Sequence, residues 1–182
     1  MMLPTLPIPS TTSRFIAWIA AAAALLIPCA AAADRYELQV HDDEVYGKYA
    51  LLEGKIDLSI ERLERKLART RSHRDLAPVL INLCAAYTMK RDFGKAEERC
   101  DAAIDNGWSV PMAYNNRGIM NIAKGDYLAA VDDFELADDR ASTTWVRRHL
   151  RQATNRIEAI ESGTQLAGVS DSSPRRLDVA AQ

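Results

Sequence analysis

The chain has 182 residues, of which 48% are hydrophobic and only 7% aromatic, and its formal net charge is −2. This length suffices for a domain with a sizeable core, and an alanine-rich, aromatic-poor composition favours closely packed helices over a β-sandwich. Because the net charge is close to zero, no field of the whole protein favours binding to nucleic acid or to a membrane surface.

Residues 1–33 have the features of a cleaved export signal. Arg14 supplies the positive charge, residues 15–27 form an unbroken apolar run, and the alanines at 31–33 are the small residues that a signal peptidase requires. The apolar run is shorter than the ~20 residues that span a bilayer. We therefore expect cleavage after Ala33, a periplasmic or secreted location, and no membrane contact afterwards. The alternative is that the segment is retained as an anchor.

The next stretch is less regular. Residues 34–40 are interpreted as a short polar lead, and residues 41–74 as a degenerate copy of a helical hairpin that recurs more clearly further along. Ile56 and Leu63 share one face of its second helix. Lys66 stands where the later copies have alanine, which a terminal unit tolerates because one of its faces meets solvent. The alternative is an unrelated helical hairpin.

The segments 77–110 and 111–142 carry one pattern twice, at a constant offset of 34 residues. The matched pairs are Leu80 with Tyr114, Asn82 with Asn116, Cys84 with Gly118, Phe93 with Tyr127, Ala96 with Ala130, Cys100 with Phe134, and Ala103 with Ala137. A constant offset of this kind is typical of an array in which each helical unit buries its apolar face against the next.

The end of the chain changes character twice. Residues 143–162 place Val146, Leu150 and Ile157 on one apolar stripe, which predicts an amphipathic helix that covers the last repeat. Residues 163–182 contain Ser, Gly and Pro without periodicity, and we expect them to be a disordered tail.

The repeated pattern resembles the tetratricopeptide repeat (TPR), whose period is 34. Its sequence of large, small, aromatic, Ala, large and Ala positions is met by Leu80, Cys84, Tyr87, Ala96, Cys100 and Ala103. The resemblance implies an all-α fold, a right-handed superhelical array of three TPR helix hairpins (41–74, 77–110 and 111–142) with a C-terminal capping helix at 143–162.

In the TPR fold the first helices of successive repeats line a concave surface that binds a protein or peptide partner. The corresponding residues here are Ile81, Asn82, Ala85, Thr88, Met89, Met112, Asn115, Asn116 and Ile119. Because an amide offers both a donor and an acceptor, Asn82 and Asn116 are suited to hold an extended peptide backbone. The alternative is that they only bond neighbouring helices. Some TPR proteins bind carboxylates through a basic clamp, but Met112 and Asn116 stand where Lys and Arg are needed.

The same resemblance places Cys84 and Cys100 opposite one another in one hairpin. An oxidising compartment would favour a disulfide between them. The alternative is a pair of free thiols that pack as small apolar side chains.

No motif in the sequence carries catalytic chemistry. His41, His73 and His149 fall in different elements, none at metal-ligand spacing from Cys or a carboxylate, and no phosphate-binding loop occurs. We therefore expect no enzyme activity, metal or cofactor, and no nucleic-acid partner. The expected function is a protein- or peptide-binding scaffold in the bacterial cell envelope, with a partner that the sequence does not identify. The alternatives are a self-associating module that forms a homodimer and, less favoured, an uncharacterised enzyme or metal protein.

Overall fold

The computed structural model describes residues 34–41, 47–162 and 177–181, which contain seven α-helices and two β-strands. The strands are β1 (Tyr36–Val40) and β2 (Leu177–Ala181), and the helices are α2 (Lys48–Leu52), α3 (Ile56–Arg69), α4 (His73–Lys90), α5 (Phe93–Asn106), α6 (Val110–Lys124), α7 (Tyr127–Arg140) and α8 (Thr144–Glu161). This part of the chain is predominantly helical, as its composition indicates. The predicted export signal lies outside the described residues.

Two helical hairpins, α4–α5 and α6–α7, follow one another at the 34-residue offset of the sequence pattern. Arg91 and Gly125 end their first helices in the left-handed region, with φ of 63° and 92°. Asp92 and Asp126 then cap the second helices by accepting a backbone N–H from three residues further on. A left-handed residue followed by a carboxylate cap stops one helix and starts the next in the opposite direction. The connection between α4 and α5 therefore ends before Phe93, which is the first residue of α5.

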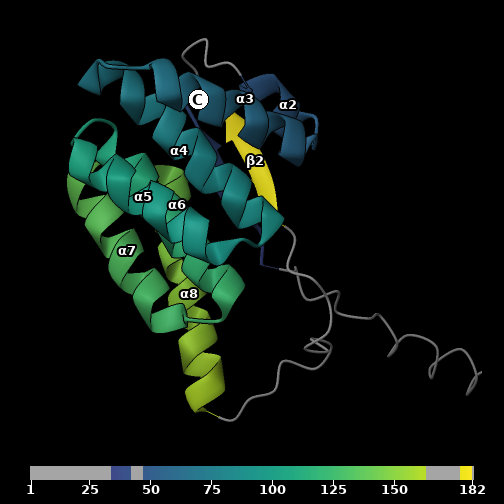
Figure 1. Cartoon of the computed structure of the whole chain (residues 1–182). Helices are drawn as coiled ribbons and strands as arrows, with labels where there is room; N and C mark the ends of the chain where they lie inside the picture. The colour runs from purple at the N-terminus through teal and green to yellow at the C-terminus, as the bar shows by residue number, and fades with distance from the viewer. Residues whose placement is uncertain (1–33, 42–46, 163–176, 182) are drawn as a thin grey trace, which may run out of the picture. The chain divides into compact units, whose positions relative to one another are not determined.

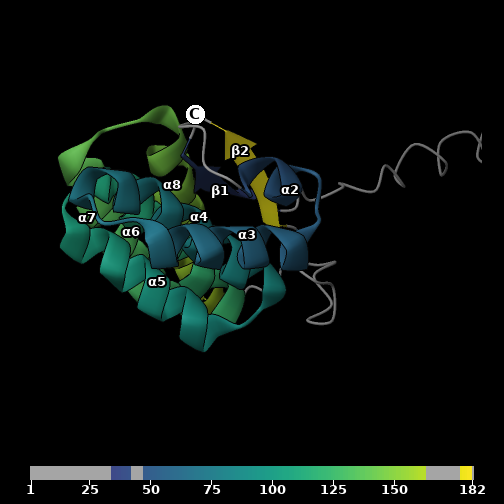
Figure 2. The same ribbon diagram turned by 45° about the horizontal axis from the view of Figure 1, so that its top comes forward.

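Consecutive helices from α3 to α8 pack against one another, and α4 also packs against α6. Figure 1 shows α4, α5, α6 and α7 side by side, with directions that alternate along the chain. Strand β1 contacts α4 and α6, and strand β2 contacts β1 and α2. Figure 2 shows both strands between α2 and the helices of the two hairpins. None of the helices described is long and apolar enough to cross a membrane.

Strand β1 corrects the prediction of a polar lead at 34–40. Tyr36, Leu38 and Val40 are at most 2% exposed, and they share a core cluster with Ile119 and Phe134. Alternating side chains of a strand point to opposite faces, so the apolar residues at alternate positions all meet the helices. The alternation of apolar and polar residues extends over only five positions, which is a short signal for a strand.

Strand β2 corrects part of the prediction for the C-terminal tail. Residues 177–181 pair with β1 in parallel, with Tyr36 opposite Leu177 and Val40 opposite Ala181. The expected disorder is therefore wrong for 177–181. The rest of the tail, 163–176 and residue 182, lies outside the described residues.

Two helices begin at other positions than the predicted repeat bounds, 41–74 and 77–110, suggest. Helix α4 starts at His73, with Ser72 in the capping position, so Asp75 lies inside the first turn and does not cap it. Pro78 lies inside the helix, beyond its first turn. In the first predicted repeat, the described part of the leading helix is only α2, which follows Gly47. Residues 42–46, which precede it, lie outside the described residues.

The crossing of α6 and α7 depends on Gly118. A Cβ added there would lie 2.7 Å from the Cε1 atom of the Phe134 ring. We expect Gly118→Ala to lower the free energy of unfolding by about 1–3 kcal/mol, because the crossing becomes overpacked. Gly94 in α5 has open space around it, so Gly94→Ala should be neutral or stabilising. Urea denaturation of both variants checks this, and equal stabilities would contradict it.

Candidate functional site

The candidate site is the groove in which α4, α6 and α8 hold β1. Four side chains from these helices bond to the backbone of the strand or to one another: Asn82, Asn115, Asn116 and His149. We call them the strand-holding side chains. All four are fully buried. Burying a polar group is costly unless the group is hydrogen-bonded. The partners of these four side chains therefore show what the groove recognises.

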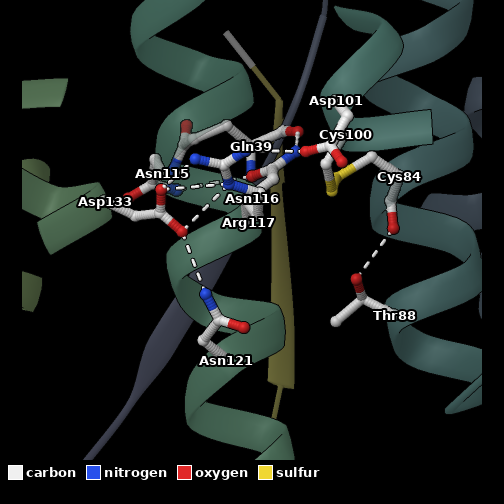
Figure 3. The surroundings of a disulfide bond; sticks show 10 residues. All are labelled: Gln39, Cys84, Thr88, Cys100, Asp101, Asn115, Asn116, Arg117, Asn121 and Asp133. Atoms are coloured by element: carbon white, nitrogen blue, oxygen red, sulfur yellow. Dashed lines mark hydrogen bonds and ion pairs between the residues drawn. A yellow bond between two sulfur atoms is a disulfide. The ribbon is translucent and has the colours of Figure 1, made fainter. Parts of the chain in front are cut away.

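Asn116 binds both backbone groups of Gln39. Its Oδ1 atom accepts the Gln39 N–H at 2.7 Å, and its Nδ2 atom donates to the Gln39 carbonyl oxygen, also at 2.7 Å. Figure 3 shows the two residues in contact. The side-chain amide thus makes the pair of bonds that a neighbouring strand would otherwise supply. This contact reads an extended backbone and does not depend on the side chain of Gln39.

Asn82 occupies the same repeat position on α4 and bonds two residues further along the strand. Its Oδ1 atom accepts the His41 N–H at 2.9 Å. Its Nδ2 atom is buried and has no hydrogen-bond partner among the described residues. The strand therefore runs from the α6–α8 end of the groove towards α4, and the two equivalent amides contact alternate residues of it.

His149 on α8 holds the other end of the strand. Its Nε2 atom accepts the Glu37 N–H at 3.2 Å, which places the ring proton on Nδ1, and Nδ1 then donates to Asn115 Oδ1 at 2.8 Å. Asn115 Nδ2 in turn donates to the Glu37 carbonyl oxygen at 3.4 Å. Burial, with a smaller contribution from Arg148, lowers the pKa of His149 to about 3. The ring is therefore neutral at physiological pH and free to accept.

These contacts leave the two edges of β1 in different environments. The strand-holding side chains bond the backbone of residues 37, 39 and 41. In an extended chain the backbone groups of alternate residues point to opposite edges. The groups of Tyr36, Leu38 and Val40 therefore point to the other edge, where β2 pairs in parallel.

Side chains of β1 add contacts that depend on its sequence. The Tyr36 ring stacks on Phe134 with ring centroids 6.3 Å apart, and it lies 5.6 Å from the His149 ring. Glu37 forms a salt bridge with Arg148 at 2.8 Å. The groove thus combines contacts to any extended backbone with contacts that select this particular segment.

The surface predicted to receive a partner is occupied by the chain's own strand. Six of its nine residues lie in the groove as strand-holding side chains or in the core around β1: Asn82, Ala85, Met89, Asn115, Asn116 and Ile119. The other three lie elsewhere. Ile81 and Met112 belong to a separate core cluster, and the Thr88 hydroxyl bonds back to the Cys84 carbonyl oxygen.

Two parts of this site lie outside the sequence-based predictions. His149 has no predicted role, because a lone histidine on an amphipathic helix carries no pattern of its own. Strand β1 was missed although Tyr36, Leu38 and Val40 alternate with polar residues. That alternation was the signal available for it.

A partly buried ion cluster joins α6 to α5 and α7. Arg117, next to Asn116 in the sequence, contacts Asp133 on α7 at 2.7 Å and Asp101 on α5 at 2.6 Å. Asn121 also donates to Asp133 at 3.0 Å. Figure 3 shows Arg117 between Asp133 and Asp101, which lie on opposite sides of it. Burial alone would lower the pKa of Arg117, but the two carboxylates raise it, so the guanidinium stays charged.

The disulfide that the sequence left open is present between Cys84 on α4 and Cys100 on α5. Their Cα atoms are 5.0 Å apart and both residues are fully buried. In the chain-entropy model, closing a loop of this length stabilises the folded state by about 3 kcal/mol. The bond ties together the hairpin that carries Asn82.

Comparisons with known proteins give no relative from which a function could be inferred: no family model, curated protein or solved structure matches the chain. Within the described ranges, no group of three or more His, Cys, Asp or Glu side chains is placed to hold a metal ion. The groove itself is therefore the basis for a functional proposal.

The neutral state of His149 predicts a pH dependence of stability. Its pKa is about 3 in the folded state, against ~6.5 in an unfolded chain. The folded state binds fewer protons than the unfolded state. The stability that neutral His149 contributes is therefore fully present above the unfolded-state pKa, and it is lost as the pH falls below that pKa. We expect wild-type to lose about 2 kcal/mol between pH 7 and pH 5 from this group.

Urea denaturation at the two pH values measures that loss. In His149→Gln the amide can still accept from Glu37 but does not titrate, so its stability should change less over the same range. Parallel losses in the two proteins would show that another group is responsible.

Proposed function

We propose that this chain is an exported protein-binding scaffold of the TPR type, which captures an extended segment of a partner at β1, the strand that the groove holds in place. The observation that carries the proposal is the pair of 2.7 Å hydrogen bonds from Asn116 to the backbone of Gln39. A side chain that satisfies both backbone groups of one residue is suited to extended polypeptide in general.

The TPR assignment is supported by the two hairpins at an offset of 34 residues and by the equivalent amides at 82 and 116. In a TPR array these amides lie on the concave face, and that is the face on which this family holds its partners. Export is supported by the sequence features of residues 1–33. The disulfide between Cys84 and Cys100 is consistent with an oxidising compartment such as the periplasm.

The double variant Asn82→Ala and Asn116→Ala tests the proposal. We expect it to capture substantially less partner from cell-envelope extracts than the wild-type chain, since it can no longer hold a strand in the groove. Quantitative mass spectrometry of the captured proteins provides the measurement. Asn155→Ala is the matched control, because Asn155 is an exposed asparagine on α8. Equal capture by the wild-type chain and the double variant would remove the groove from the function.

Self-association is a second candidate function, favoured by an apolar hollow that α7 and α8 form. The hollow, of roughly 290 Å³, lies between the start of α7 and the end of α8. Leu128 and Ile160 line it with 69% and 56% of their surfaces exposed. If copies associate through this end, light scattering should detect a dimer that Leu128→Glu abolishes. A wild-type monomer would discard this candidate.

A further inference from the structure

We propose that the outer edge of β1, the edge that carries the backbone groups of Tyr36, Leu38 and Val40, is a strand-addition site. It takes an extended segment of a partner protein, parallel to β1, in the place where β2 lies. The inference rests on the proposed function, because it names where the captured segment binds. Strand β2 is then an intramolecular occupant that a partner must displace.

The two edges of β1 are held by different means. On the inner edge, side chains of three helices bond the strand. The strand cannot leave this edge without breaking all of these bonds. On the outer edge, the strand pairs with the backbone of β2. A strand edge whose partner is another backbone accepts any extended chain that can reach the same register. The outer edge is therefore the exchangeable one.

The surroundings of the two strands show the same difference. Strand β1 packs against α4 and α6, and its apolar side chains are buried in the largest core cluster. The main helix contact of β2 is α2, a helix of five residues. Figure 1 shows β2, in yellow, beside α2. Strand β2 therefore has fewer helix contacts to lose on leaving than β1 has.

The outer edge cannot remain empty at low cost. Leu38 and Val40 are fully buried, and a buried backbone N–H or C=O without a partner costs about 1–3 kcal/mol. The edge therefore favours some strand at all times. Strand β2 belongs to the same chain as β1, so its pairing is intramolecular and needs no second molecule to arrive. A partner segment must therefore compete with a tethered strand.

The register indicates which segments fit. With Leu38 opposite Val179 in a parallel ladder, the backbone groups of Asp178 and Ala180 point towards β1, and those of Val179 and Ala181 point away. A ligand therefore needs free N–H groups at the positions of 178 and 180, and proline is excluded there. The sequence of β2, Leu-Asp-Val-Ala-Ala, indicates a segment of mainly small and aliphatic residues.

This ladder provides a matched pair of variants. Ala180→Pro removes an N–H that pairs with β1, whereas Ala181→Pro removes one that points away from it. The probe is a fluorescently labelled peptide with the sequence of residues 176–182, added to the full-length mature chain. We expect Ala180→Pro to bind the peptide at least tenfold more tightly than wild-type, because its own strand no longer competes. Ala181→Pro should bind it as wild-type does.

Hydrogen exchange in the wild-type chain gives a second measurement that needs no variant. If β2 leaves while β1 stays, the amides of Leu38 and Val40 should exchange faster than those of Glu37 and Gln39, which side chains hold. Saturating peptide should slow the two fast amides.

Three results would overturn the proposal: no gain of peptide binding in Ala180→Pro, equal exchange at both edges, or a concentration-dependent dimer that Ala180→Pro abolishes. The last would make a second copy of the chain the occupant. The proposed function would survive each of them as long as the Asn82→Ala and Asn116→Ala double variant still lost its partner.

Discussion

Replacing Asn116 by alanine should destabilise the protein more than any other single change in the groove. The substitution leaves the Gln39 N–H and carbonyl oxygen without the two 2.7 Å bonds that Asn116 makes. Gln39 is 1% exposed, so water does not replace them readily. At about 1–3 kcal/mol for each unsatisfied buried group, the free energy of unfolding should fall by about 2–6 kcal/mol. Urea denaturation at pH 7 measures it.

Asn82→Ala is the matched comparison at the equivalent repeat position. Asn82 makes one bond to the strand, and its Nδ2 atom is already unpaired. Its removal should therefore cost about 1–3 kcal/mol at most, which is less than the cost at Asn116. If the two variants are equally stable, or if Asn82→Ala is the less stable one, then the amides do not anchor β1 in the way described.

Arg117→Met should be the second variant with a large effect. Arg117 donates to both oxygens of Asp133, whose side chain is only 4% exposed. Methionine keeps most of the volume but leaves the carboxylate in the core with Asn121 as its remaining partner. Breaking a buried ion pair by removing one member costs about 3–5 kcal/mol, and we expect the free energy of unfolding to fall by that amount.

Two further variants separate this cause from a general loss of packing. Arg99→Met removes the bonds to Glu64 and Glu98, but these carboxylates are 32% and 63% exposed. Water can solvate them, so the cost should stay below about 1 kcal/mol. Combining Arg117→Met with Asp133→Asn removes the buried charge itself and should recover part of the lost stability. A double variant less stable than Arg117→Met would contradict the charge explanation.

The sequence by itself determined the helices and their repetition. The 34-residue offset between residues 77–110 and 111–142 recurs in the two hairpins, down to the caps Asp92 and Asp126. Patterns of this kind are local, because capping residues and helical spacing act within a few positions of one another. The same reasoning singled out Asn82 and Asn116 as amides able to hold an extended backbone.

Only the tertiary structure decided what those amides hold. The sequence placed the strand ligand in another molecule, whereas Gln39 and His41 of the same chain occupy the groove. Their contacts join residues separated by 77 and 41 positions, and no local pattern records such pairings. His149 joins the site over a separation of 112 residues. The backbone of β1 is bonded by side chains on one edge and by a strand from the other end of the chain on the other. Burial decides this arrangement, because each backbone group in the core needs a partner wherever the fold can supply one.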